Sequence, residues 1–387
     1  MLSTRPFEEA AERGDLRAMV GDLLARELPG ERALAADRDG AFPAAAWSAL
    51  GAAGLLGLGG AESAGGSGGT VGDAVAVVEE IARVLPSLAV DYVLCGMAMR
   101  MLADVPGAAA RAWLPAIASG AMICAFGMSE PDVGTDLLNL RTSARVADGR
   151  WVLRGQKLWI SLAHKAEIAF TVCRTDPPEG GRARGLSVIA VPLGRPGVTV
   201  RRVRLAGMRA AGTCEIYFDD ATAPLENLVG ERGRAMALLG RTLDVERVLA
   251  AGLSLGIGRA ALDLHLAHLR EREAFGGPIG RFQALQHAAA DSIADLSASR
   301  ALVDSAVRAV EGGRPATALT GMAKLVAAES TARIVDRGMR AMAAQGLAEE
   351  SAMQMYFRDA RLQLFSPVSN DMIRNILGES LGLPRSY

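Results

Sequence analysis

Apolar residues recur at helical spacing in the first and last thirds of the chain. The clearest example in the first third is the run Ala74, Val75, Val78, Ile81, Ala82 and Leu85. A Gly/Ser tract over residues 59–72 interrupts this region and predicts a loop. Helical periods return after Gly230 and continue to about residue 380. We therefore expect one helical domain over residues 1–120 and another over residues 229–387.

The period changes between residues 121 and 228, where short β-branched or aromatic runs alternate with turn signals. These runs cover residues 151–153, 159–161, 168–173, 186–191 and 214–218. Pairs such as Asp148-Gly149 and Pro196-Gly197 separate them. The pattern predicts antiparallel strands in a small sandwich or barrel. The expected fold class is therefore α+β, with the β domain over residues 121–228.

One predicted helical stripe in the last third contains a carboxylate. The stripe consists of Leu239, Leu243, Glu246, Ala250, Leu253 and Ile257. Burying an unpaired carboxylate is unfavourable unless the group is protonated or serves a ligand. A functional role for Glu246 is the favoured interpretation. The alternative is a surface ion pair between Glu246 and either Arg247 or Arg241.

Charge and composition exclude several classes of protein. The chain has 42 Lys and Arg against 43 Asp and Glu, with a formal net charge of −1, which argues against a nucleic-acid partner. Only Lys157, Lys165 and Lys324 are lysines, which leaves 39 arginines. Together with abundant Ala and Gly, this excess of arginine is typical of a GC-rich genome, and we attach no function to it.

The remaining composition points away from metals, disulfides and membranes. The four cysteines are widely spaced, and the four histidines, including His265 and His268, form no metal-binding motif. Residues 1–9 turn acidic at once and lack the apolar region of a signal peptide. No stretch reaches the uninterrupted apolar length of a membrane span. We expect a soluble, cytoplasmic protein with reduced thiols, no metal and no membrane partner.

Four motifs occur in order along the strand-rich region and the C-terminal helices. They lie at residues 124–136 (CAFGMSEPDVGTD), 155–161 (GQKLWIS), 272–276 (REAFG, followed by Phe282-Gln283) and 358–361 (RDAR). In this order and spacing the chain resembles the acyl-CoA dehydrogenase family of flavoproteins over nearly its whole length. The resemblance implies an N-terminal helical domain, a middle antiparallel β-barrel or sandwich and a C-terminal four-helix bundle. It also implies a homotetramer, a dimer of dimers, with FAD between the β domain and the C-terminal helices.

The resemblance assigns the flavin end of FAD to the β domain. The backbone around Met128 and the hydroxyl of Ser129 would meet the pyrimidine edge, and Phe126 holds a position that is often Tyr. Trp159 would pack beside the isoalloxazine ring, and Ser161 would hydrogen-bond its N5 side. Neutral donors at this edge suit a flavin that gains negative charge on reduction.

The other end of FAD is assigned to the C-terminal helices. Arg272, Phe275 and Gln283 would contact the pyrophosphate and adenine of an FAD held mainly by a neighbouring subunit. An arginine suits a pyrophosphate because its planar fork donates in pairs to anionic oxygens. The remaining implied FAD contacts are Thr135, Arg340, Ala344 and Ser369. Ala343 and Ala344 replace family glycines, and alanine is unfavourable at positive φ.

The usual catalytic glutamate of the family is absent. Ungapped counting from Arg358 puts Pro367 at its position, where proline also lacks the N–H that would help to polarise a thioester carbonyl. A one-residue register shift could restore this donor from Ser366 or Val368. Isovaleryl-CoA and long-chain acyl-CoA dehydrogenases use a glutamate on an earlier helix, before an arginine, and Glu246 matches that place.

The resemblance implies FAD-dependent α,β-dehydrogenation of an acyl thioester carried by CoA or by acyl carrier protein. Glu246 would remove the α-proton, and flavin N5 would accept hydride from Cβ. Asp244, Arg247 and Pro367 would contact the substrate, and an electron-transfer flavoprotein or similar acceptor would take the electrons. Two alternatives stay open: a flavin-dependent monooxygenase or oxidase of the same fold, and a flavin-deficient partner subunit of a mixed tetramer.

Overall fold

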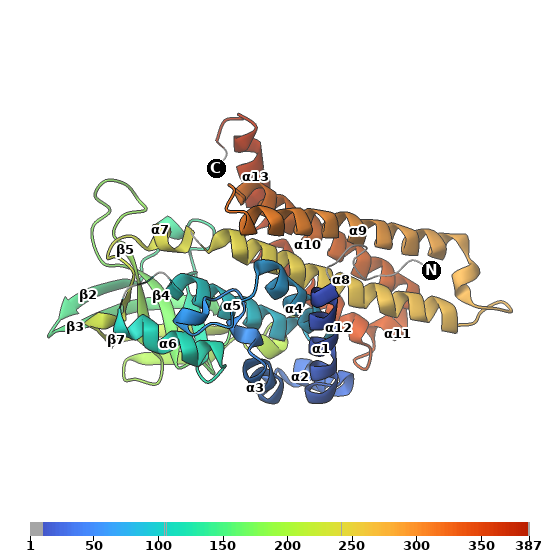
Figure 1. The fold of residues 1–387 in the computed structure, drawn as a ribbon, viewed down its shortest axis with the longest axis horizontal. Coiled ribbons are helices and arrows are strands. Elements are labelled where there is room, and N and C mark those ends of the chain that lie inside the picture. Colours follow the sequence, from blue (N-terminus) through green and yellow to red (C-terminus); the bar gives the residue numbers. More distant parts are fainter. Residues whose placement is uncertain (1–10, 104, 106, 241, 386–387) are drawn as a thin grey trace.

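The computed structural model describes residues 11–103, 105, 107–240 and 242–385 of the chain (Figure 1). The N-terminal segment interpreted above as lacking a signal peptide, and Arg241, lie outside the described residues. Helices, a β-sheet and a second set of helices follow one another along the chain. This order confirms the predicted α+β fold class.

The first helices pack around α4 and α5, whose side chains are mostly buried. Helix α4 begins at Val71 because Thr70 caps it. Thr70 Oγ1 accepts from the N–H of Asp73 at 3.1 Å, and the Asp73 carboxylate accepts from the N–H of Thr70 at 2.9 Å. The Gly/Ser loop therefore ends at Thr70 rather than at Gly72. The helices are α1 (Ala11–Glu27), α2 (Gly30–Asp39), α3 (Ala44–Ala52), α4 (Val71–Val84), α5 (Pro86–Ala103) and α6 (Ala108–Ala118).

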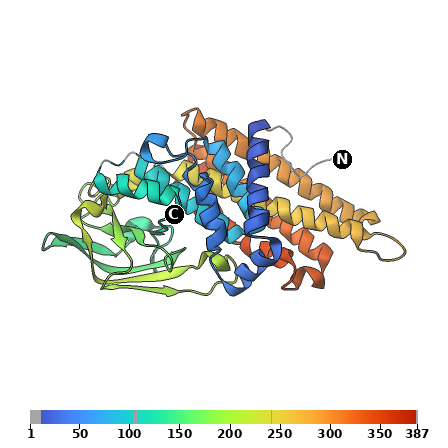
Figure 2. The ribbon, with the colours of Figure 1, turned by 60° about the horizontal axis from the view of Figure 1, so that its bottom comes forward.

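The middle of the chain forms one hydrogen-bonded sheet at one end of the molecule, beside the helices (Figure 2). Its strand order is β6-β7-β3-β2-β4-β5-β8, with β1 paired to β4. Most pairs are antiparallel as predicted, but β4 pairs in parallel with β1 and with the start of β2. The strands are β1 (Cys124–Gly127), β2 (Ser143–Ala147), β3 (Arg150–Ile160), β4 (Ile168–Arg174), β5 (Leu186–Pro192), β6 (Val198–Arg202), β7 (Cys214–Pro224) and β8 (Leu228–Val229).

Both faces of the sheet are buried along β4. Phe170 and Val172 belong to the large core that the sheet shares with the helices, whereas Ala169 and Cys173 belong to a second apolar cluster within the β domain. Successive side chains of a strand point to opposite faces. Burial of both faces explains why this strand is apolar at nearly every position rather than alternating.

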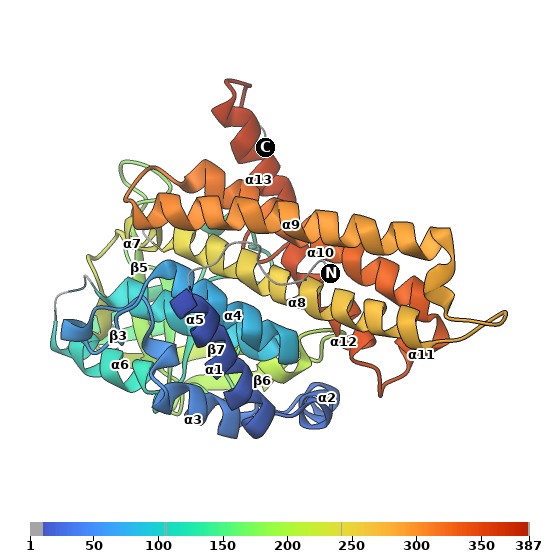
Figure 3. The same ribbon diagram turned by 45° about the vertical axis from the view of Figure 1, so that its right-hand side comes forward.

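The last third of the chain is built on three long helices, α8, α9 and α10, which lie side by side (Figure 3). Helix α8 also packs against α4 and α5, so it joins the two helical regions. The helices are α7 (Ala235–Gly240), α8 (Leu243–Glu271), α9 (Gln283–Glu311), α10 (Thr317–Met342), α11 (Ala344–Leu347), α12 (Ala352–Asp359) and α13 (Asn370–Ser380).

Helix α8 corrects two expectations from the sequence. Every residue from Glu246 to Leu262 is buried, so this segment of the helix has no polar face, and the part of the predicted stripe from Glu246 to Ile257 lies in it. Leu239 belongs to α7, because that helix ends at Gly240 and α8 begins at Leu243. The apolar run of α8 reaches a mean hydropathy of 1.2 and is long enough to span a membrane, but 89% of it is buried inside the protein. Packing in the core accounts for its apolar composition.

Candidate active site

Glu246 lies in the first turn of α8, where the chain passes from the sheet into the long helices. Its side chain is only 6% exposed. Burial raises the pKa of this carboxyl group from its ordinary value of 4.5 to about 7, although the field of Arg247 opposes the shift. A carboxyl group with this pKa can accept a proton near neutral pH.

The neighbouring arginine is engaged elsewhere. Arg247 donates to Asp244 at 3.4 Å, and within the described part of the chain the Glu246 carboxylate has neither an ion pair nor a hydrogen bond. The surface pairing with Arg247 that the sequence allowed is therefore not formed. The alternative pairing with Arg241 falls outside the described residues.

Two threonines of α10 fix the start of α8. Asp244 accepts hydrogen bonds from Thr320 Oγ1 at 2.9 Å and from Thr317 Oγ1 at 3.2 Å. Arg247 is 7% exposed, and its Nε has no hydrogen-bond partner in the described structure. The Glu246 carboxyl group and the Nε–H of Arg247 are therefore the groups at this point to which a ligand can still hydrogen-bond.

A small cavity of about 20 Å³ lies between α8, α5, α4 and the segment before α4, and Glu246 is not among the residues that line it. Val245 and Leu249, which flank Glu246 on α8, form one wall. Gly96 of α5 keeps the opposite wall open, since a Cβ there would lie 3.3 Å from Leu249 Cδ1. The lining residues are Leu56, Leu58, Gly59, Val71, Ala74, Tyr92, Gly96, Arg100, Val245 and Leu249. At about 20 Å³ the cavity has room for about one water molecule, so it does not by itself hold an acyl group.

The residues assigned to the flavin end of FAD all lie in the β domain. Phe126 is buried in β1, and Met128 and Ser129 follow directly after this strand, half-buried. Trp159, near the end of β3, leaves 56% of its surface exposed at a φ of 66°, and Ser161 is half-buried. An uncovered indole beside neutral hydroxyl groups has the chemistry that suits an isoalloxazine ring. These residues therefore fit FAD.

The residues assigned to the pyrophosphate and adenine lie far from the β domain. Arg272, Phe275 and Gln283 occupy the connection from α8 to α9, at the opposite end of the long axis (Figure 1). All three are exposed, and Phe275 is 88% exposed. Arg340 and Ala344, at the end of α10 and the start of α11, are exposed at the same end. One chain alone does not bring the two predicted halves of an FAD site together.

Three residues at which the sequence departs from the family pattern, Ala343, Arg340 and Pro367, have a distinctive backbone conformation or ion pair. Ala343 adopts a φ of 51°, so it occupies the left-handed region where the family has glycine. Arg340 pairs with Asp336 at 2.8 Å and remains 80% exposed. Pro367 is exposed and follows a cis peptide bond.

Two other predicted cofactor contacts are Ser369, which caps a helix, and Thr135, which lies on an exposed loop. Ser369 caps α13, because its hydroxyl accepts from the N–H of Met372 at 3.1 Å. Thr135 is exposed on the loop after β1. Among the described residues no group of His, Cys, Asp or Glu is arranged to hold a metal ion, and the four cysteines are free and buried.

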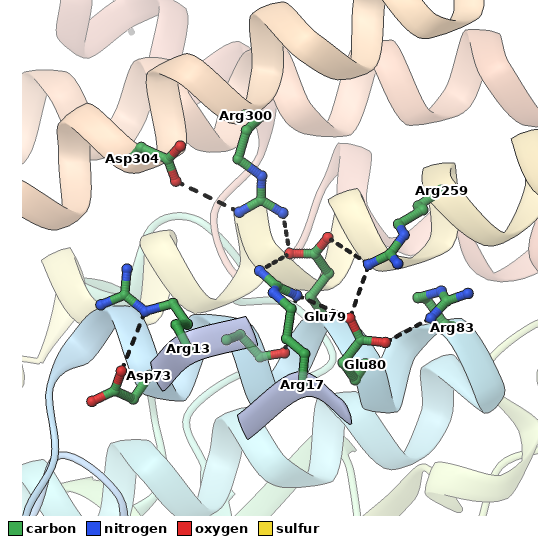
Figure 4. Close-up of polar contacts among 10 residues, drawn as sticks. Arg13, Arg17, Asp73, Glu79, Glu80, Arg83, Arg259, Arg300 and Asp304 are labelled. Carbon is green, nitrogen blue, oxygen red and sulfur yellow. Dashed lines mark hydrogen bonds and ion pairs between the residues drawn. The ribbon is translucent and has the colours of Figure 1, made fainter. Parts of the chain in front are cut away.

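A buried ion network was not predicted from the sequence. Figure 4 shows Arg17, Arg259 and Arg300 converging on Glu79 and Glu80. Arg17 contacts Glu79 at 2.8 Å and Glu80 at 3.1 Å, and Arg259 contacts Glu80 at 2.9 Å. Adjacent glutamates in an apolar helical run were the available signal. The network joins α1, α4, α8 and α9 and lies apart from the residues assigned to substrate.

Comparison with known proteins gives a consistent result over the whole chain. Family models described as the N-terminal, middle and C-terminal domains of acyl-CoA dehydrogenase match residues 10–121, 125–221 and 233–382. A cyclohex-1-ene-1-carbonyl-CoA dehydrogenase of Syntrophus aciditrophicus (strain SB) is 32% identical over 383 residues, which cover 97% of this chain and 91% of that protein. The mitochondrial isovaleryl-CoA dehydrogenase of Arabidopsis thaliana is 30% identical over 308 residues, which cover 78% of this chain and 74% of that protein. A glutaryl-coenzyme A dehydrogenase solved with glutaryl-CoA superposes with a TM-score of 0.92 and 28% identity, covering 98% of both chains.

Proposed function

Because this chain belongs to the acyl-CoA dehydrogenase family, whose members are oxidoreductases acting on CH–CH groups, we propose that it dehydrogenates an acyl thioester with Glu246 as the base. The observation that carries the proposal is the buried Glu246 carboxyl group, which has a raised pKa and no ion pair among the described residues.

The chemistry removes one proton and one hydride from the substrate. Glu246 takes the proton from Cα, and FAD, when bound, accepts the hydride that leaves Cβ. The pKa of about 7 means that a substantial fraction of Glu246 is ionised at neutral pH. Its buried position also keeps water away from the proton during transfer.

A backbone donor for the thioester carbonyl remains in spite of Pro367. The N–H of Ser366 already donates to Leu362 O at 2.9 Å. In the described chain the N–H of Val368 has no acceptor. We assign Val368 as the donor, because a hydrogen bond to the carbonyl oxygen stabilises the negative charge that develops there.

The cofactor site joins two subunits. The flavin-end residues and the pyrophosphate-end residues lie at opposite ends of one chain (Figure 1), so FAD binds between the β domain of one copy and the C-terminal helices of another. This arrangement is consistent with a homotetramer. The substrate is an acyl group on CoA or acyl carrier protein, and an electron-transfer flavoprotein or similar acceptor takes the electrons.

The proposal is tested by mixing the purified protein anaerobically with a panel of acyl-CoA and acyl-carrier-protein thioesters. Bleaching of the flavin absorbance is expected with at least one of them, and Glu246→Gln should abolish it. Asp359→Asn is the matched control, because Asp359 is likewise a buried carboxyl group with its pKa raised by burial to about 7, but lies at the end of α12 and is not assigned to substrate or cofactor. This variant should still bleach.

Other outcomes separate the alternatives. Absence of bleaching by every thioester, with rapid oxygen consumption by the reduced protein, would replace the proposal with a monooxygenase or oxidase. A protein that stays colourless after addition of FAD would identify a flavin-deficient subunit instead.

A further inference from the structure

Lysine is rare in this chain, and its positions are therefore informative. The sequence has 39 arginines but only Lys157, Lys165 and Lys324. Lys165 is exposed, whereas Lys157 and Lys324 are both 0% exposed. The two fully enclosed positions suit the compact ammonium group of lysine better than the larger, planar guanidinium of arginine.

Lys157 of β3 contacts the turn that follows β1, residues 127–130, which we call the flavin-side turn. Its Nζ donates to Met128 O and to Glu130 Oε1, each at 2.9 Å. The stem of Lys157 lies under Gly127, where a Cβ would come within 3.3 Å of Lys157 Cγ. The lysine thus supports from beneath the segment that carries Met128 and Ser129.

Glu130 extends this support to the next segment of the loop. Its carboxylate accepts from the N–H of Arg141 at 2.7 Å and from the N–H of Thr142 at 2.9 Å. The N–H of Leu158 donates to Ser129 O at 3.0 Å. The flavin-side turn is therefore fastened to β3 and to the chain before β2 through the Lys157–Glu130 pair.

Lys324 of α10 makes the corresponding contacts on residues 366–370, which we call the substrate-side turn. Its Nζ donates to Val368 O and to Asn370 Oδ1, each at 2.8 Å. Asn370 Nδ2 donates in turn to Glu329 Oε1 at 3.2 Å. Like Lys157, Lys324 joins one backbone carbonyl and one side-chain oxygen of a single turn.

Both ammonium groups are kept in spite of unfavourable burial. Burial lowers the pKa of Lys157, and Glu130 opposes this effect. Burial also lowers the pKa of Lys324 to about 8, with Glu329 raising it and Arg247 lowering it further. Thr320, one turn before Lys324 on α10, donates to Asp244 at 2.9 Å, so Lys324 lies near the start of α8. A buried cation is costly unless its hydrogen bonds are well made, so these contacts carry a definite geometric requirement.

We propose that Lys157 and Lys324 are positioning residues, Lys157 for the flavin-side turn and Lys324 for the substrate-side turn. The inference rests on the proposed function, which assigns Met128 and Ser129 to the flavin and the N–H of Val368 to the thioester carbonyl. Each lysine holds a backbone carbonyl and so orients the donors of its turn. Neither lysine touches the cofactor or the substrate itself.

The first test measures backbone hydrogen exchange by mass spectrometry on the full-length protein without added ligand. Lys157→Met keeps an unbranched side chain and removes the charge. Exchange over residues 127–142 should accelerate on the order of tenfold, with residues 366–372 unchanged. Lys324→Met should give the reverse result. Each variant is therefore the matched control for the other.

The second test measures ligand binding and turnover in the same variants. Lys157→Met should raise the Kd for FAD on the order of tenfold and shift the flavin absorption band, with little change in the KM for thioester. Lys324→Met should raise KM and lower kcat, with a smaller effect on the Kd for FAD than Lys157→Met, because Ser369 is the one implied FAD contact in the substrate-side turn. Lys157→Arg and Lys324→Arg should not restore the wild-type values, because both sites are fully enclosed.

Two results would overturn the proposal. Either variant could accelerate exchange equally in both turns, or a variant could fail to accelerate exchange in the turn that its lysine contacts. If a methionine variant does not fold, Glu130→Gln and Asn370→Ala can replace it, because each weakens one contact while keeping the lysine. Each should accelerate exchange in its own turn and not in the other, with a smaller effect than the methionine variant. A wild-type protein that binds no FAD or is not bleached would contradict the proposed function. The exchange measurements would still decide whether the lysines hold the turns.

Discussion

At the residue scale, the catalytic role that we propose for Glu246 comes with a cost in stability. Its pKa is about 7 in the folded protein against an ordinary value of 4.5, so the folded state holds this proton more tightly than the unfolded chain. The bound proton of Glu246 contributes to the free energy of unfolding. This contribution is fully present below pH 4.5 and is lost as the pH rises through about 7. Arg247 limits the shift because its positive charge favours the ionised carboxylate.

We predict that Glu246→Gln removes turnover and stabilises the fold at alkaline pH. At pH 8 the variant should gain ~3 kcal/mol in free energy of unfolding, because it no longer buries a charge. The gain should disappear below the ordinary pKa of glutamate. Denaturant titrations at several pH values measure this, and a gain that did not depend on pH would contradict the assigned pKa.

The same carboxyl group should control the pH profile of the reaction. Since the base must be deprotonated, kcat/KM should rise with pH through a midpoint near 7. Arg247→Met removes the charge that lowers the pKa of Glu246, so the midpoint should move to higher pH. Arg374→Met, which changes an arginine that is half exposed on α13, is the control. An unchanged midpoint in Arg247→Met would show that another group titrates.

At the scale of elements, the buried ion network holds four helices together (Figure 4). Burial alone would raise the pKa of Glu79, but Arg300, Arg17 and Arg259 outweigh it and lower the pKa to about 2. The stability contributed by Glu79 is therefore present above pH 4.5 and is lost as the pH falls through about 2. Because α8 takes part through Arg259, the network also fixes the helix that carries Glu246.

We predict that Glu79→Gln lowers the free energy of unfolding at pH 7 by about 3–5 kcal/mol, since it leaves buried guanidinium groups without compensation. The variant should also lose less stability than the wild type on acidification. Arg154→Ala breaks the exposed Arg154–Asp220 pair and is the control, with no change expected in the unfolding midpoint. Equal stability of Glu79→Gln and the wild type would mean that the network contributes nothing net.

At the scale of the whole molecule, the two predicted halves of the FAD site lie at opposite ends of one chain. Trp159 is exposed on the β domain, and Arg272 and Phe275 are exposed on the far connection between α8 and α9 (Figure 1). Large exposed aromatic side chains mark surfaces that another molecule covers. A second copy that contributes its own far end would complete each site.

Subunit complementation tests this arrangement. Trp159→Ala and Arg272→Ala should each bind FAD weakly as separate proteins. Co-refolding equal amounts should restore about one quarter of the sites, because half of the pairs are mixed and one of the two sites in a mixed pair has both wild-type halves. Mixing the folded variants without exchange of subunits is the control. No recovery after co-refolding would place both halves of the site in one chain.

The order of elements was predictable because helices and strands impose short, local periods on a sequence. The runs at 168–173 and 186–191 became β4 and β5. The parallel pairing of β1 with β4 was not predictable, since the partners Cys124 and Ile168 are far apart in the chain. The break between α7 and α8 was also missed, because the apolar spacing continues across it.

The sequence by itself determined the fold class and singled out Glu246, because a carboxylate inside a long apolar run is visible without knowing its neighbours. Only the tertiary structure decided that this carboxylate stays apart from Arg247, which pairs with Asp244. It alone placed Lys157 and Lys324 beneath their turns. The physical reason is that periodicity reports local backbone geometry, whereas a charge finds its partner only when folding brings distant segments into contact.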